Sequence, residues 1–117
     1  MSRIFVYGTL KVGGRAHDLL ERHDSQFLGE VITDPRFHLY NLGWFPGMVM
    51  DGDLEGGVHG ELYEVTESCL EAMDQYEGAP HLFRRDEITL ADGSMSLAYL
   101  YAQKFSDCPR VVGGVWE

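Results

Sequence analysis

Residues 58–78, VHGELYEVTESCLEAMDQYEG, place a strand-like run directly before the clearest helix of the chain. The run 58–65 predicts a strand. A helix is predicted over 67–77, because Thr66 suits the N-cap and Glu67 suits the positive end of the helix dipole. Gly78 ends this helix, and a proline follows two residues later. This stretch therefore supplies one strand and one well-capped helix of a mixed domain.

Short β-prone runs make up most of the remaining chain. Strands are predicted over 3–7, 27–32, 37–42, 48–50, 85–90 and 95–101, with a second short helix over 16–22. Asp92-Gly93 lies between the last two strands and predicts a hairpin. Because strands dominate without alternating regularly with helices, we expect one α+β domain over 1–117. Its sheet is expected to be small, mixed, mostly antiparallel and barrel-like, with an irregular tail packed on the body.

The composition narrows the classes of partner. Of the 117 residues, 44% are hydrophobic and 24% are charged, a balance that argues against disorder. The formal net charge of −10 argues against nucleic acid and against an anionic membrane, since both bind basic patches. No apolar run approaches the roughly 20 residues that span a bilayer. No signal-peptide pattern precedes the first strand, so we expect a cytoplasmic protein.

Metal and redox chemistry have little support in the sequence. Cys69 and Cys108 lack CxxC spacing and are expected to remain thiols, Cys69 as a small core residue. The acidic run 51–56 imitates the start of a calcium loop, but its twelfth position is Leu62 instead of a bidentate glutamate. The five histidines show neither HxxxH nor HxH spacing. We therefore expect no metal and no other cofactor.

Glu77 is the unusual residue of the predicted helix. At about 100° per residue, the apolar residues of this helix gather on one stripe, formed by Cys69, Leu70, Met73 and Tyr76. Glu77 falls on the same stripe, where burial and the negative end of the helix dipole raise the pKa of a carboxyl group. A raised pKa suits a glutamate to proton transfer near neutral pH. The alternatives are a frayed last turn or a pair with Arg84 or Arg85, of which Arg85 is expected to be a structural ion-pair partner.

The turn after the first strand is a second candidate site. Gly8 follows a buried run and lets the backbone turn with its N–H groups exposed, an arrangement that binds carboxylates or phosphates. Gly8 and Gly13 have the spacing of a phosphate loop, but the next two residues are Gly14 and Arg15 where that loop needs Lys and Ser or Thr. We therefore expect no nucleotide here. A tight turn without a ligand is the alternative.

The chain resembles the γ-glutamylcyclotransferase-like family in three motifs, IFVYGTLKVG at 4–13, VHGELYEV at 58–65 and MDQYEG at 73–78. Three shorter pieces follow in the family's order, FRR at 83–85, AYLY at 98–101 and GVW at 114–116. The resemblance thus covers nearly the whole chain. The opening YGTLK and the later D-x-Y-E-G are specific together, whereas either motif alone is a weak signal.

The resemblance implies a mixed α+β domain and a metal-independent enzyme. Members of the family release 5-oxoproline from a γ-glutamyl amine or γ-glutamyl amino acid, as the substrate's own α-amine attacks its γ-carbonyl. Glu77 would be the catalytic general base and acid. The backbone of four residues would bind the glutamyl α-carboxylate: Tyr7, Gly8, Thr9 and Leu10. The implied partner is a small-molecule substrate, and the oligomeric state stays open.

Further substrate contacts are expected from two aromatic side chains. Phe83 stands where many relatives carry a tyrosine. Tyr101 is preferred over Tyr99, on the expectation that the two alternate across a strand and only one faces the pocket. His81 and Leu82 are expected to border the leaving-group side. The segment WFPG at 44–47 either walls a pocket or packs in the core or at its rim.

Two other functions remain open at this point. One is a non-catalytic small-molecule-binding or interaction module that keeps the fold. The other is an amide hydrolase that uses water, which would need room for an ordered water beside Glu77.

Overall fold

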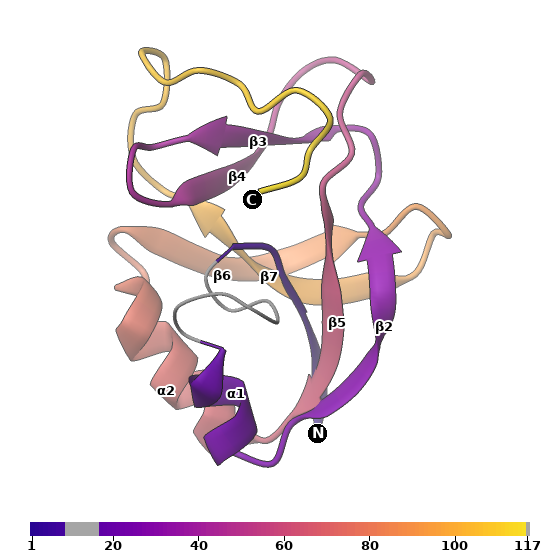
Figure 1. Cartoon of the computed structure of the whole chain (residues 1–117), viewed down its shortest axis with the longest axis vertical. Coiled ribbons are helices and arrows are strands. Elements are labelled where there is room, and N and C mark those ends of the chain that lie inside the picture. The colour runs from indigo at the N-terminus through magenta and orange to yellow at the C-terminus, as the bar shows by residue number, and fades with distance from the viewer. Residues whose placement is uncertain (9–16, 117) are drawn as a thin grey trace.

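The computed structural model describes residues 1–8 and 17–116 and shows a small α+β fold (Figure 1). Its elements follow the chain in the order β1 (Ser2–Val6), α1 (Asp18–Arg22), β2 (Gln26–Ile32), β3 (Phe37–Asn41), β4 (Pro46–Met50), β5 (His59–Val65), α2 (Glu67–Glu77), β6 (Phe83–Thr89) and β7 (Met95–Tyr101). Strands dominate, as predicted. No helix in the described part of the chain is long and apolar enough to cross a membrane.

Five strands form one mixed sheet in the order β2-β5-β1-β7-β6, and β3 and β4 form a separate hairpin. Strand β1 pairs antiparallel with β5 and parallel with β7, whereas the other neighbours are antiparallel. The expected barrel-like closure is not reached. Beyond their ends, the edge strands β2 and β6 continue into a single isolated bridge between Thr33 and Leu90. The sheet is therefore open, with the parallel β1–β7 pair at its centre.

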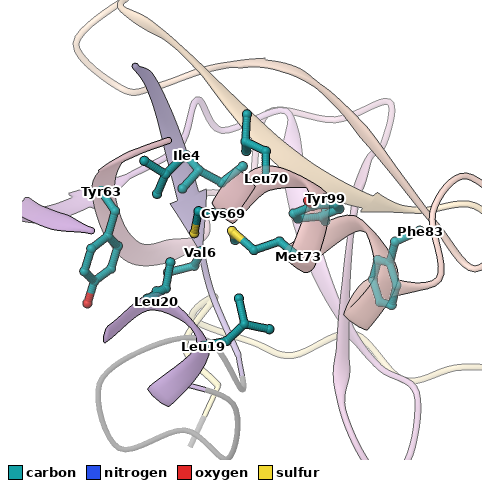
Figure 2. Packing of buried hydrophobic residues seen from close by; sticks show 11 residues of the cluster. Ile4, Val6, Leu19, Leu20, Tyr63, Cys69, Leu70, Met73, Phe83 and Tyr99 are labelled. Carbon is teal, nitrogen blue, oxygen red and sulfur yellow. The ribbon is translucent and has the colours of Figure 1, made fainter. Parts of the chain in front are cut away.

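Helix α2 has the predicted bounds because both of its ends are capped. The Thr66 hydroxyl accepts a hydrogen bond from the Cys69 N–H at 3.2 Å. At the other end Gly78 adopts a left-handed conformation with φ of 66°, which glycine tolerates without strain. Figure 2 shows Cys69 and Met73 facing the core formed with β1 and α1. Tyr76 is 47% exposed, so the apolar stripe is narrower than the helical wheel predicts.

Two strands, β4 and β6, begin two residues earlier than the sequence predicts. Strands β6 and β7 form the expected hairpin around Asp92-Gly93, and their register pairs Phe83 with Tyr101. Strand β6 therefore starts at Phe83, because its partner strand is long enough to reach that residue. In the same way, β4 starts at Pro46, which pairs with Asn41 of β3. Pairing with a neighbour, and not local β propensity, sets these two bounds.

The C-terminal tail is irregular and packs on the body, as predicted. The main-chain N–H of Val111 donates to the carbonyl of Leu39 at 2.7 Å. Arg110 forms ion pairs with Asp51 at 3.0 Å and with Asp53 at 3.3 Å. The acidic loop that imitates the start of a calcium site thus uses two carboxylates to hold the tail against β3 and β4.

Both cysteines are free thiols, as predicted. Cys69 is fully buried on α2, and this burial raises the pKa of its thiol. A buried thiol that keeps its proton is a poor nucleophile, so Cys69 contributes packing to the core.

Candidate functional site

A cavity of about 240 Å³ lies where the ends of several remote segments meet. Strand β1 and its turn contribute Tyr7 and Gly8, and the last turn of α2 contributes Glu77. Other segments complete the lining with mostly apolar side chains: Phe45 and Pro46 before and in β4, Leu82 and Phe83 after α2, and Tyr99 of β7. The two features that the sequence marked separately, the Gly8 turn and Glu77, therefore share one cavity.

Glu77 lies in a well-formed last turn and not in a frayed helix end. The N–H of Ala79 donates to the carbonyl of Asp74 at 2.9 Å, which closes the helix directly behind Glu77. Burial raises the pKa of the Glu77 carboxyl to about 7. The alternative ion pairs do not form, because Arg84 pairs with Asp86 at 3.3 Å and Arg85 pairs with Asp74 at 3.1 Å.

Tyr7 is buried and ties the Gly8 turn to two other strands. Its hydroxyl donates to the carbonyl oxygen of Tyr99 and accepts from the N–H of Met48 at 3.1 Å. Burial is the main cause that raises the pKa of Tyr7, and the nearby carboxylate of Glu77 adds to it. Tyr7 is therefore a neutral group whose hydrogen bonds tie the end of β1 to β7 and to β4.

Gly8 is required by a close approach of two segments. A Cβ atom at this position would lie 2.8 Å from Cγ of Pro46, closer than real side-chain atoms approach. The backbone of the turn can therefore pass beneath Pro46 only without a side chain. Thr9 and Leu10, the other two residues of the expected carboxylate cradle, lie outside the described residues.

Tyr101 is the tyrosine of β7 expected to contact the substrate, and this contact stays a prediction, but the residue of β7 in the cavity lining is Tyr99. Tyr99 lines the cavity, whereas Tyr101 lies one ring away and packs edge-on against Phe83 at a centroid distance of 5.5 Å. Residues two apart on a strand point to the same face, so Tyr99 and Tyr101 do not alternate. The two residues differ in their position along β7. Tyr99 lines the cavity, whereas Tyr101 contacts the ring of Phe83, which is a lining residue.

Several lining residues were not singled out by the sequence as substrate contacts. Phe45 and Pro46 line the cavity, which agrees with the pocket-wall alternative for the WFPG segment. Of the two residues expected on the leaving-group side, Leu82 lines the cavity and His81 is not among its lining residues. Their neighbour Trp44 is 82% exposed. Asp74 was overlooked: its carboxylate accepts from the Tyr99 hydroxyl at 2.6 Å and pairs with Arg85. Its spacing of three from Glu77 was visible in the sequence, but its partners on β6 and β7 were not.

Cation binding has no support in the described part of the chain, which holds no cluster of three or more His, Cys, Asp or Glu side chains placed to bind a metal. The Asp51 carboxylate accepts from the Tyr40 hydroxyl at 2.7 Å and from Arg110. Asp53 pairs with His38 at 2.8 Å. These carboxylates are already engaged by protein partners.

Several known proteins are similar to this chain in sequence or in overall fold. The sequence model of the family described as gamma-glutamyl cyclotransferase, AIG2-like, matches residues 4–117. A relative from Vibrio cholerae, provisionally named a gamma-glutamylcyclotransferase, is 38% identical over 115 residues, which are 97% of this chain and 93% of that protein. The gamma-glutamylcyclotransferase family protein YtfP of Escherichia coli K12 is 31% identical over 97% of this chain and 95% of its own.

A solved structure agrees with these sequence matches. The crystal structure of an AIG2-like protein from Mus musculus has a TM-score of 0.85 and 27% identity, over all of this chain and 88% of that one. The resemblance that the motifs indicated is thereby confirmed, and the chain belongs to the AIG2-like gamma-glutamyl cyclotransferase family.

Proposed function

We propose that the protein is a γ-glutamylcyclotransferase, which releases 5-oxoproline from a γ-glutamyl amine or a γ-glutamyl amino acid. One observation carries the proposal: Glu77, a carboxyl group whose pKa is raised to about 7, lines the same cavity as the Tyr7–Gly8 turn. A group with this pKa exchanges a proton readily near neutral pH. The turn supplies backbone at the place where an α-carboxylate would bind.

The reaction needs one proton carrier and a correctly bent substrate. Glu77 takes a proton from the substrate's α-ammonium, and the freed amine attacks the γ-carbonyl carbon to form the ring C–N bond. Glu77 returns this proton to the amide nitrogen and takes the second proton from the ring nitrogen, which became positively charged on attack. The amide C–N bond then breaks, and the second proton leaves with the released amine, which becomes an ammonium ion. Since nucleophile and electrophile belong to one molecule, holding them close to attack geometry can lower the barrier by about 7–11 kcal/mol.

The apolar part of the cavity would receive the leaving amine. Phe45 and Phe83 contact each other at a centroid distance of 6.0 Å, and Leu82 lies beside them in the cavity lining. Among the described lining residues, Glu77 is the one that carries a formal charge. This wall favours a leaving amine with an apolar body over one with a carboxylate, because desolvating an unpaired carboxylate is costly.

The proposal is tested by incubating the protein with a panel of γ-glutamyl amides and detecting 5-oxoproline by mass spectrometry. The panel includes the matched pair γ-glutamyl-phenethylamine and γ-glutamyl-phenylalanine, which differ by one carboxylate. Glu77→Gln is expected to abolish product formation, whereas Glu71→Gln, on the exposed face of the same helix, is expected to leave it intact. No product from any amide, or equal turnover by the Glu77→Gln variant, would contradict the proposal.

A further inference from the structure

The phenol group of Tyr99 enters the cavity region from β7, but its proton is held outside the cavity. The Tyr99 hydroxyl donates to Oδ1 of Asp74 at 2.6 Å. The other oxygen of this carboxylate, Oδ2, lies 3.1 Å from Nη1 of Arg85 on β6. A short hydrogen bond to a charged acceptor is among the strong ones, so Tyr99 has a definite partner.

The second phenol beside Glu77 is engaged as well. Tyr7 donates its proton to the carbonyl of Tyr99 and accepts from the main chain of Met48. Among the described residues, no side chain donates a hydrogen bond to the Glu77 carboxyl, and burial is the physical cause of its raised pKa. Two tyrosines thus border the glutamate without stabilising its charged form.

Asp74 and Glu77 are close neighbours on α2. Residues three apart share one side of a helix, with about 5–6 Å between their Cβ atoms. The Tyr99 hydroxyl, which bonds to Asp74, therefore lies next to the side-chain position that Glu77 occupies on the same side of the helix. Burial is the main cause that raises the pKa of Tyr99, the bond to Asp74 is the next, and the negative charge of Glu77 makes a smaller contribution. Without Asp74 as an acceptor, Glu77 is the carboxylate of the same helix that lines the cavity together with Tyr99.

We propose that Asp74 is a positioning residue of the site: held by Arg85, it binds the Tyr99 hydroxyl and so keeps that hydroxyl from hydrogen-bonding to Glu77. The inference rests on the proposed function, in that it explains how Glu77 stays a competent base. A hydrogen bond donated to the charged carboxylate would lower its pKa by about 1–2 units and weaken it as a base. Asp74 prevents this and fixes the Tyr99 ring as a cavity wall.

Other charged or titratable groups near Glu77 are few in the described part of the chain. Tyr7 at the end of β1, Tyr76 on α2 and Tyr99 on β7 line the same cavity. Asp74 and Arg85 lie behind Tyr99 as an ion pair, and each neutralises the charge of the other. Removing Asp74 therefore changes two things, the acceptor for Tyr99 and the partner of Arg85, and the experiment must separate them.

The test measures the titration of the Glu77 side-chain carboxyl carbon by ¹³C NMR in three proteins, the unchanged chain, Asp74→Ala and Asp74→Asn. Both substitutions remove the negative charge and free Arg85, but only asparagine keeps an oxygen that accepts from Tyr99. We expect the Glu77 midpoint in Asp74→Ala to lie about 1 unit or more below that in Asp74→Asn. When each is combined with Tyr99→Phe, the two variants are expected to titrate together.

Equal midpoints for Asp74→Ala and Asp74→Asn, or a difference that persists with Tyr99→Phe, would overturn the positioning role. If Asp74→Ala loses the helix end by circular dichroism, Tyr99→Phe alone carries the test. Its Glu77 midpoint is expected to stay unchanged, and a rise would show that the hydroxyl bonds to Glu77 after all. Because the titration uses no substrate, absence of 5-oxoproline formation would refute the proposed function without altering this result.

Discussion

Replacing Glu77 with glutamine is expected to stabilise the protein above neutral pH, at the same time as it removes the proposed catalytic base. In the folded protein the carboxyl group keeps its proton up to a pH of about 7, whereas in the unfolded chain it loses the proton near its ordinary value of 4.5. The unfolded chain is therefore favoured more and more as the pH rises between these two values, and the loss of stability levels off above pH 7.

The size of this effect follows from the difference of about 2.5 units between the two pKa values. At 1.36 kcal/mol per unit this corresponds to about 3 kcal/mol, and the partial exposure of Glu77 reduces it to about 1.5–3 kcal/mol through solvent screening. Glutamine has the shape of the protonated acid and never ionises. Glu77→Gln should thus raise the free energy of unfolding by this amount at pH 8.5 and by less than about 1 kcal/mol at pH 5, where only part of the linkage is present.

Urea unfolding at several pH values, for the unchanged chain and for Glu77→Gln, measures this difference. Glu71→Gln makes the same chemical change on the exposed face of α2, and its effect should stay within about 0.5 kcal/mol. If the stability difference between Glu77→Gln and the unchanged chain were the same at pH 5 and at pH 8.5, as is expected for Glu71→Gln, Glu77 would not lie in a desolvated site. The reasoning from burial would then be wrong.

Three further predictions concern the same cavity and its support. The kcat/KM for a γ-glutamyl amide should rise with pH through a midpoint of about 7, as Glu77 loses its proton, and a profile flat from pH 5.5 to 9 would speak against Glu77 as the base. Gly8→Ala should lower kcat/KM at least about tenfold and cost about 1–3 kcal/mol by overpacking against Pro46; native-like kinetics and urea midpoint would contradict the close approach. Met73→Ala should cost about 2–5 kcal/mol, since this fully buried side chain leaves a cavity, and a smaller loss would show that the core around α2 collapses to fill it.

The sequence predicted α2 to the residue, because every signal for it is local. The cap at Thr66, the apolar spacing and the terminating Gly78 all lie within thirteen consecutive positions. The hairpin around Asp92-Gly93 is local in the same sense. The parallel pairing of β1 with β7 is not, since it joins Ile4 to Leu97 across most of the chain, and no local pattern records such a pairing.

The residues of the candidate site can be separated in the same way, into those with a local sequence signal and those placed by contacts between distant segments. Glu77 could be found because a helical wheel needs only the helix itself, and the Gly8 turn because a glycine after a buried strand is a local signal. That Gly8 faces Pro46 could not be found, because the contact joins segments nearly forty residues apart. That Tyr99 and Tyr101 point to the same face of β7 follows from the sequence alone, since residues two apart share a face of a strand. Only the position along β7 required the structure.

The position of Trp44 next to the cavity wall has a consequence for the fluorescence of the protein. It lies directly before Phe45, which forms part of the cavity wall, and its indole is largely in water. The other tryptophan of the chain, Trp116, is partly buried in the tail and packs against a cluster of buried side chains that includes Phe37 and Leu39 of β3. A ligand that binds against Phe45 is expected to alter the surroundings of the neighbouring Trp44, and tryptophan fluorescence recorded during a ligand titration would test this. Tryptophan fluorescence should therefore report ligand binding in an assay that does not require catalytic turnover.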